Sequence, residues 1–141
     1  MITAAHVVGE GVCFIEGVGA VRIVELNSET DFAVIEPVVL TPNPLEPAVL
    51  PTSCRALPHD QYAYATGFAR GQEFNIMRGS WMEGVGSTDT TDTMTALVIR
   101  GMSGGPVIDD ETSRVVGWVI SIEAARTLTH FGELRMTSIC R

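Results

Sequence analysis

A proline-rich stretch divides this chain of 141 residues into two parts. Residues 37–58, PVVLTPNPLEPAVLPTSCRALP, hold six of the seven prolines. Proline lacks a backbone N–H and fixes φ, so such a run forms neither a helix interior nor a central strand. The sequence therefore predicts an extended connector over residues 37–60, which joins one lobe at residues 1–36 to a second lobe at residues 61–141.

Short apolar segments on both sides of the connector predict strands. Residues 11–17 and 19–37 are rich in β-branched side chains and are broken by glycines, and AVRIVEL alternates as a half-buried strand does. After the connector come QYAYATGFA, EFNIMRGSWMEGV, MTALVIR, GPVID, RVVGWVISI and ELRMTSI, each bounded by small or polar residues. The predicted fold class is all-β, a barrel or sandwich, because no segment shows a convincing helical period. Residues 86–95 are predicted as a solvated loop and residues 123–128 as a single helical turn.

Composition excludes several classes of partner. The net charge is −8, and the nine basic residues, all arginines, form no cluster that could follow a phosphate backbone, so nucleic acid is not an expected partner. No apolar run reaches the roughly 18 residues of a membrane span, and the chain as given shows no export signal. The three cysteines have neither CxxC nor metal-ligand spacing, which favours reduced thiols and predicts no metal or cofactor. Nothing in the sequence indicates the compartment or the oligomeric state.

The segment GMSGGPVID, residues 101–109, surrounds Ser103 with glycines. A serine acts as a nucleophile only where a base takes its proton and a carboxylate orients that base. His6 in ITAAHVV and Asp31 in TDFAVIEP are candidates for these two roles. Each residue alone fits an ordinary turn or strand edge equally well, and Gly104 and Gly105 alone could be plain turn residues.

Together, TAAHVV, DFAVIEP and GMSGGPV resemble the chymotrypsin-like (trypsin-like) serine peptidases, in particular bacterial members without the disulfides of the animal enzymes. The resemblance runs from residue 2 to about residue 122. It implies a two-lobed double β-barrel that acts on a peptide or protein. By this likeness Ser103 is the nucleophile, His6 the general base and then acid, and Asp31 the group that fixes the imidazole. The N–H groups of Gly101 and Ser103 would form the oxyanion hole.

The resemblance also implies where substrate binds. Leu97 would form the floor of the primary pocket, and the strand segment of Val119, Ile120, Ser121 and Ile122 would wall it and offer its backbone to the substrate. Leu97 supplies no carboxylate, so we expect an apolar residue before the scissile bond. Met102 stands where the animal digestive enzymes have an aspartate that binds a newly cut N-terminus, so activation by such a cut is not expected.

One departure from the family pattern concerns the first barrel. The family has strands ahead of its histidine motif, whereas His6 is here almost the first residue. We therefore expect a truncated chain with an incomplete first barrel. Two alternatives follow: a catalytically silent peptidase-fold module that binds protein, or an inactive fragment. An α/β-hydrolase would satisfy G-x-S-x-G but requires the order Ser, acid, His and a series of helical crossovers.

Overall fold

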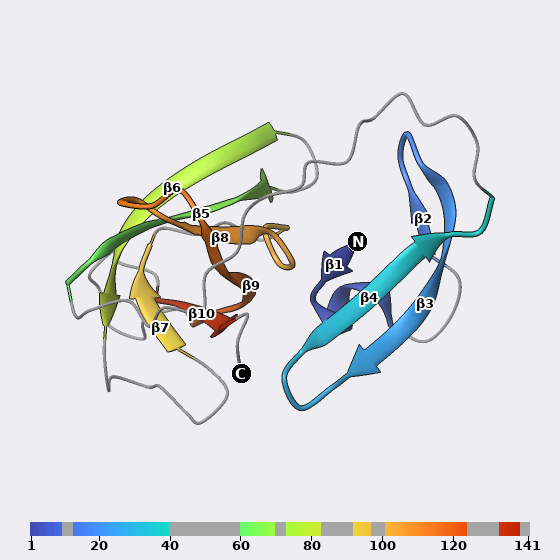
Figure 1. Cartoon of the computed structure of the whole chain (residues 1–141), viewed down its shortest axis with the longest axis horizontal. Helices are drawn as coiled ribbons and strands as arrows, with labels where there is room; N and C mark the ends of the chain where they lie inside the picture. Colours follow the sequence, from blue (N-terminus) through green and yellow to red (C-terminus); the bar gives the residue numbers. More distant parts are fainter. Residues whose placement is uncertain are drawn as a thin grey trace. The chain divides into compact units, whose positions relative to one another are not determined.

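The computed structural model describes residues 1–9, 13–39, 60–69, 73–82, 92–96, 101–123 and 133–138. The chain divides into two compact units, Met1–Val49 and Leu50–Arg141, and each is described by itself (Figure 1). Strands make up nearly all of the regular structure in the described residues, which confirms the all-β prediction. Most of the proline-rich connector lies outside the described residues, so its extended conformation and the lobe boundaries drawn from it remain predictions.

The N-terminal unit is a four-stranded antiparallel sheet in the order β1-β4-β3-β2. Its elements are β1 (Ile2–Thr3), α1 (Ala5–Val8), β2 (Cys13–Ile15), β3 (Gly19–Asn27) and β4 (Phe32–Pro37). Burial alternates along β4, where Ala33 and Ile35 are buried, and in the first half of β3 around the buried Val21; beyond the register shift after Ile23, side chains of β3 are exposed. The sheet is open over the described residues, in agreement with the predicted incomplete first barrel.

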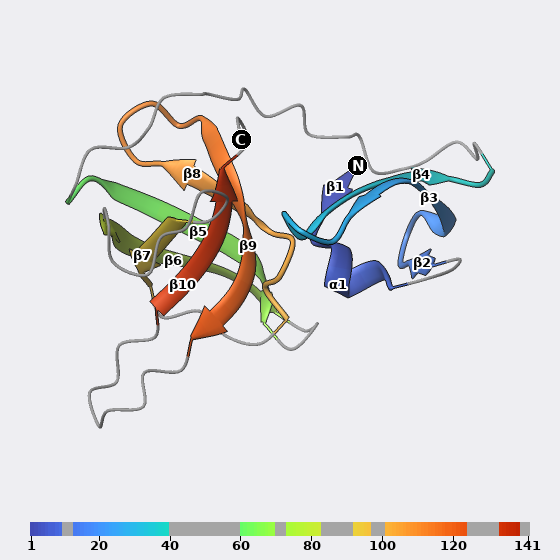
Figure 2. The same ribbon diagram turned by 90° about the horizontal axis from the view of Figure 1, so that it is seen from below.

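The first residues of the chain are held by this sheet. The terminal amino group of Met1 donates to the carbonyl of Ile35 at 2.8 Å, and Ile2 and Thr3 pair with β4. Strand β1 leads directly into α1, which lies against β3 and β4 (Figure 2). Sequence analysis did not predict this helix, because four residues are too few to show a helical period.

The C-terminal unit is a closed antiparallel barrel with the strand order β10-β7-β6-β5-β8-β9 (Figure 1). Its strands are β5 (Tyr62–Ala69), β6 (Glu73–Met82), β7 (Asp92–Thr95), β8 (Pro106–Asp109), β9 (Val115–Glu123) and β10 (Glu133–Ser138). Because the barrel is closed, no sheet edge is exposed along the paired lengths of its strands. An exposed edge could pair with another chain and cause aggregation.

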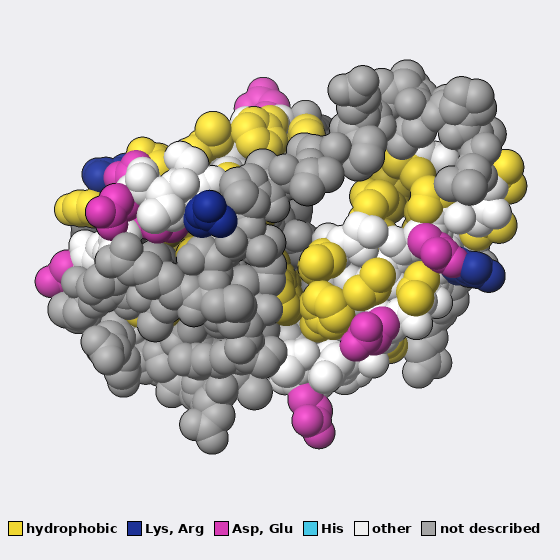
Figure 3. Space-filling view, in the orientation of Figure 1, with side chains coloured by type: hydrophobic (Ala, Val, Ile, Leu, Met, Phe, Trp, Pro, Cys, Tyr) yellow, Lys and Arg dark blue, Asp and Glu magenta, His cyan; other side chains and the backbone are white. Residues whose placement is uncertain are grey.

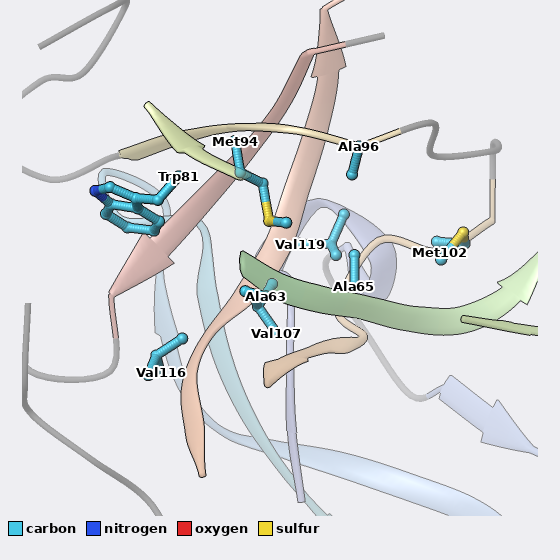
Figure 4. Close-up of a cluster of buried hydrophobic side chains, with 9 residues drawn as sticks. All are labelled: Ala63, Ala65, Trp81, Met94, Ala96, Met102, Val107, Val116 and Val119. Carbon is cyan, nitrogen blue, oxygen red and sulfur yellow. The ribbon is translucent and has the colours of Figure 1, made fainter. Parts of the chain in front are cut away.

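A cluster of nine buried side chains fills the barrel (Figure 4). Its members are Ala63, Ala65, Trp81, Met94, Ala96, Met102, Val107, Val116 and Val119. Strands β5, β6, β7, β8 and β9 each supply at least one of them, so the core packs together segments that lie far apart in the sequence. Met102, next to Ser103, is 1% exposed and therefore anchors the candidate nucleophile to this core.

The predicted loop over residues 86–95 is wrong for its last four residues, which form β7, and the strand predicted for MTALVIR is confirmed at Met94 and Thr95, where the two predictions overlap. Met94 lies opposite Trp81 and is fully buried, and Thr93 is 2% exposed. Pairing with β6 and β10 outweighs the polar composition that favoured a loop, and the β-branched threonines suit a strand. Residues 86–91 lie outside the described residues. Of the predicted helical turn at residues 123–128, Glu123 instead ends β9, and the rest lies outside the described residues.

Hydrophobic side chains also reach the surface of both units (Figure 3). Phe68 and Phe74 face each other across β5 and β6, with ring centroids 5.5 Å apart, and Phe14 on β2 is exposed.

Cys13 is a free thiol that donates a hydrogen bond to the carbonyl of Val8 at 3.0 Å. No helix in the described residues is long and apolar enough to cross a membrane.

Candidate active site

His6 and Asp31 form a hydrogen-bonded pair in the N-terminal unit. His6 lies in α1, and Asp31 lies in the turn between β3 and β4. Nδ1 of His6 is 2.6 Å from Oδ2 of Asp31, and the backbone N–H of His6 donates to Oδ1 of the same carboxylate at 2.8 Å. The carbonyl of Asp31 accepts a third bond, from the N–H of Ala5 at 3.1 Å. The structure therefore brings these two predicted site residues together, and their catalytic roles stay a prediction.

This arrangement holds the imidazole by Nδ1, and no hydrogen bond to Nε2 is found among the residues that the structure describes. The ionised carboxylate can only accept a hydrogen bond, so the neutral ring carries its hydrogen on Nδ1 and presents Nε2 as an acceptor. The His6 side chain is 50% exposed and that of Asp31 is 21% exposed. The ring is thus accessible for proton transfer, while the carboxylate that orients it is largely shielded.

Ser103 lies in the C-terminal unit, in a tight turn at residues 101–105 that we call the Ser103 loop. Gly101 has φ 103° and Gly104 has φ 83°, a region that side chains with a Cβ rarely enter. The N–H of Gly105 donates to the carbonyl of Met102 at 3.0 Å and closes the turn. Ser103 is the central residue of this turn, and it is half-buried.

Two backbone hydrogen bonds connect the Ser103 loop to β9. The N–H of Gly104 donates to the carbonyl of Val119 at 2.7 Å, and the N–H of Val119 donates to the carbonyl of Gly105 at 2.9 Å. Within the described residues, no acceptor contacts the N–H of Gly101 or of Ser103. The two amides predicted for the oxyanion hole therefore have no partner in this part of the chain.

The Ser103 loop also approaches the backbone of β5 closely. A Cβ at Gly105 would lie 1.9 Å from the carbonyl oxygen of Thr66, and one at Gly67 would lie 3.0 Å from Cα of Met102. Real Cβ atoms essentially never come within 1.9 Å of a backbone atom, and a contact of 3.0 Å is tighter than most. Gly105 is therefore more than a plain turn residue, because its lack of a side chain lets the loop rest on β5.

Comparisons with known proteins agree with this fold. A family model described as the trypsin-like peptidase domain matches residues 1–117. The chain belongs to the trypsin-like peptidase family. A search of curated proteins gave no match.

Solved structures of proteases share the family's fold with this chain. The Rv3671c protease from M. tuberculosis, in its active form, is 22% identical over 96% of this chain and 63% of its own, with a TM-score of 0.69. The HtrA-type protease AlgW with a decapeptide is 18% identical over 98% of this chain and 44% of its own, with a TM-score of 0.71. At these identities the likeness establishes the chymotrypsin-like fold. The chain spans less than two thirds of the length of either protein.

The structure describes only some of the residues that are predicted to bind substrate. Leu97 lies outside the described residues. Val119 and Ile120 are buried in β9, and Ser121 and Ile122 continue that strand, opposite β10. Strand β8 pairs with β9 only as far as Trp118, so the other edge of residues 120–122 has no strand partner among the described residues.

Sequence reasoning missed two residues that shape this site. Gly67 lies in TGFARG, a segment that predicts only a strand, and its role appears only when β5 meets Met102. Asn27 precedes Asp31 by four residues, and its side chain bonds within the turn. An asparagine at the end of a strand is a general turn signal that could have found Asn27, whereas no local pattern marks Gly67.

Proposed function

We propose that this domain is a serine endopeptidase that hydrolyses peptide bonds through an acyl-enzyme, with Ser103 as nucleophile, His6 as base and Asp31 as the orienting carboxylate. The observation that carries the proposal is the pairing of His6 with Asp31, which fixes one ring nitrogen and leaves the other to accept a proton. Membership of the trypsin-like peptidase family supports the assignment of Ser103, which stands in the turn of GMSGG.

In the proposed reaction, Oγ of Ser103 attacks the carbonyl carbon of the scissile bond while Nε2 of His6 takes the hydroxyl proton. The negative charge that develops on the carbonyl oxygen is stabilised by the N–H groups of Gly101 and Ser103. His6 then gives its proton to the leaving amine, and the acyl group stays on Ser103. A water molecule, deprotonated by His6, releases the acid and restores the hydroxyl. Asp31 keeps its charge throughout and stabilises the imidazolium.

The proposed substrate is an extended peptide that adds a strand to β9. Residues 120–122 have a free edge opposite β10 within the described part of the chain, and main-chain hydrogen bonds to that edge would align the peptide. AlgW, with the same fold, has been solved with a decapeptide and with a tripeptide. Leu97 supplies no charge, so we infer a preference for Leu, Met or Phe before the scissile bond.

A fluorophosphonate reagent tests the nucleophile directly. Wild-type protein should be labelled on Ser103, and Ser103→Ala should lose both labelling and turnover with an unchanged circular dichroism spectrum. Ser113→Ala is a matched control, because Ser113 lies in the turn after β8, outside the proposed site. Peptide-library profiles test the specificity, and a profile dominated by Arg or Lys would contradict it. Peptide binding without labelling would instead identify a silent binding module.

A further inference from the structure

The side chain of Asn27 forms hydrogen bonds within the turn that carries Asp31. Asn27 and Phe32 are the last cross-strand pair of β3 and β4, and residues 28–31 connect them. Oδ1 of Asn27 accepts two backbone hydrogen bonds, from Glu29 at 3.0 Å and from Thr30 at 3.1 Å. An asparagine side chain that bonds the backbone two and three residues ahead fixes the direction of a turn. Asn27 therefore restrains the backbone conformation of residues 28–30, which lead to Asp31.

Asp31, the next residue, has an unusual backbone conformation. Its φ is 52°, in the left-handed region that few residues other than glycine adopt. This conformation directs its carbonyl to the N–H of Ala5 and its carboxylate to His6. A change in the preceding turn would move all three of these contacts together, because they originate from a single residue.

We propose that Asn27 is a positioning residue for the His6–Asp31 pair, and its catalytic meaning rests on the function proposed above. Asn27 does not touch His6 in this role. It acts through Asp31: its two bonds to Glu29 and Thr30 restrict the turn to the path from which the Asp31 carboxylate meets Nδ1 of His6. Without Oδ1 of Asn27 the two N–H groups turn to water, the sheet persists, and Asp31 samples other conformations.

The test compares four variants of the full chain. Asn27→Ala removes the acceptor, and Asn27→Gln keeps the amide but sets it one carbon too far from the turn. Asn27→Asp retains an oxygen at the same position and should restore the wild-type behaviour. Ser28→Ala alters the same exposed turn without touching the acceptor, and is the matched control.

The first readout is the tautomer of His6, which needs no enzymatic activity. In protein labelled with ¹⁵N-histidine, the ring signals of His6 are assigned by their loss in His6→Gln and are read at a pH where the ring is neutral. Wild type, Asn27→Asp and Ser28→Ala should carry the hydrogen on Nδ1. Asn27→Ala and Asn27→Gln should show ring ¹⁵N shifts that move toward each other, as in a mixture of tautomers.

The second readout is the split between kcat and KM. Asn27→Ala should lower kcat by about fivefold, the effect of one neutral capping interaction, with KM unchanged. Unchanged ¹⁵N shifts in Asn27→Ala and Asn27→Gln would overturn the positioning role, even in an active peptidase. Equal changes in Ser28→Ala, or no rescue by Asn27→Asp, would overturn it as well. An inactive wild type with the expected tautomers would instead remove the proposed function and leave the positioning role of Asn27 intact.

Discussion

Replacement of Gly105 by alanine should displace the loop that carries Ser103. A Cβ at this position lies 1.9 Å from the carbonyl oxygen of Thr66 and 2.9 Å from that of Met102. Close carbon–oxygen contacts in proteins begin at about 3.3 Å, so the loop and β5 must separate by about 1.4 Å. A misplacement of about 1 Å costs roughly a hundredfold in rate. We therefore expect kcat/KM to fall by at least about a hundredfold.

Gly79→Ala is the matched control for this experiment. Its Cβ would lie 1.5 Å from the carbonyl oxygen of Thr95, so it overpacks the same barrel between β6 and β7. Both substitutions should lower the free energy of unfolding in urea, by about 1 to 3 kcal/mol or more. Only Gly105→Ala should lower the rate per folded molecule.

The assay measures kcat/KM after titration of the active sites with a fluorophosphonate, at a temperature where both variants remain folded. Gly67→Ala provides an intermediate case. Its Cβ would lie 3.0 Å from Cα of Met102, so Met102 would have to move by only a few tenths of an ångström. Its loss of rate should be smaller than that of Gly105→Ala. Equal losses per folded molecule in Gly105→Ala and Gly79→Ala would refute the argument that Gly105 places the nucleophile.

Two further predictions concern carboxylates. Asp31→Asn should lower kcat by about 10⁴-fold with little change in folding, because the amide favours the wrong tautomer of His6; a loss below tenfold would contradict its role. Burial raises the pKa of Asp109, but hydrogen bonds from Thr112, the Glu111 N–H and Gln61 outweigh it and hold that pKa below its usual range. A lowered pKa adds stability above the unfolded value of about 3.9, which is lost as the pH falls through the folded value. Asp109→Asn should therefore flatten the decline in unfolding free energy below about pH 4, and an unchanged slope in urea titrations would exclude this.

The sequence was sufficient to predict the strands whose side chains alternate and the segments that carry chemistry. AVRIVEL lies in β3 and PVID forms β8, as predicted, although Val24 and Leu26 are exposed in β3 and the charged Asp109 is buried in β8. His6 and Asp31 are predicted as partners through the resemblance of their segments to the chymotrypsin-like serine peptidases, and Nδ1 of His6 lies 2.6 Å from Oδ2 of Asp31. The strands depend on local patterns, which a single sequence displays, whereas this pair depends on the family resemblance.

Features that depend on contacts between distant segments could not be predicted. Strand β7 has a loop-like composition, and only its pairing with β6 and β10 makes it a strand. Gly67 and Gly105 are separated by 38 positions, and their need for small size arises where β5 meets the Ser103 loop. The helical turn that carries His6 is stabilised by Asp31 from outside, in place of a capping side chain at Ala4. No local pattern in the helix itself reveals that support.

The His6–Asp31 pair in one unit and Ser103 in the other are therefore held by different forces. Asp31 and His6 are placed by hydrogen bonds in a partly exposed turn, where water can replace a lost partner at small cost in free energy. Ser103 is placed by the burial of Met102 and by the contact of Gly105 with β5, where a change in volume disturbs the core. Rate and stability should thus separate in variants around Asp31, and they should fall together in variants of the Ser103 loop.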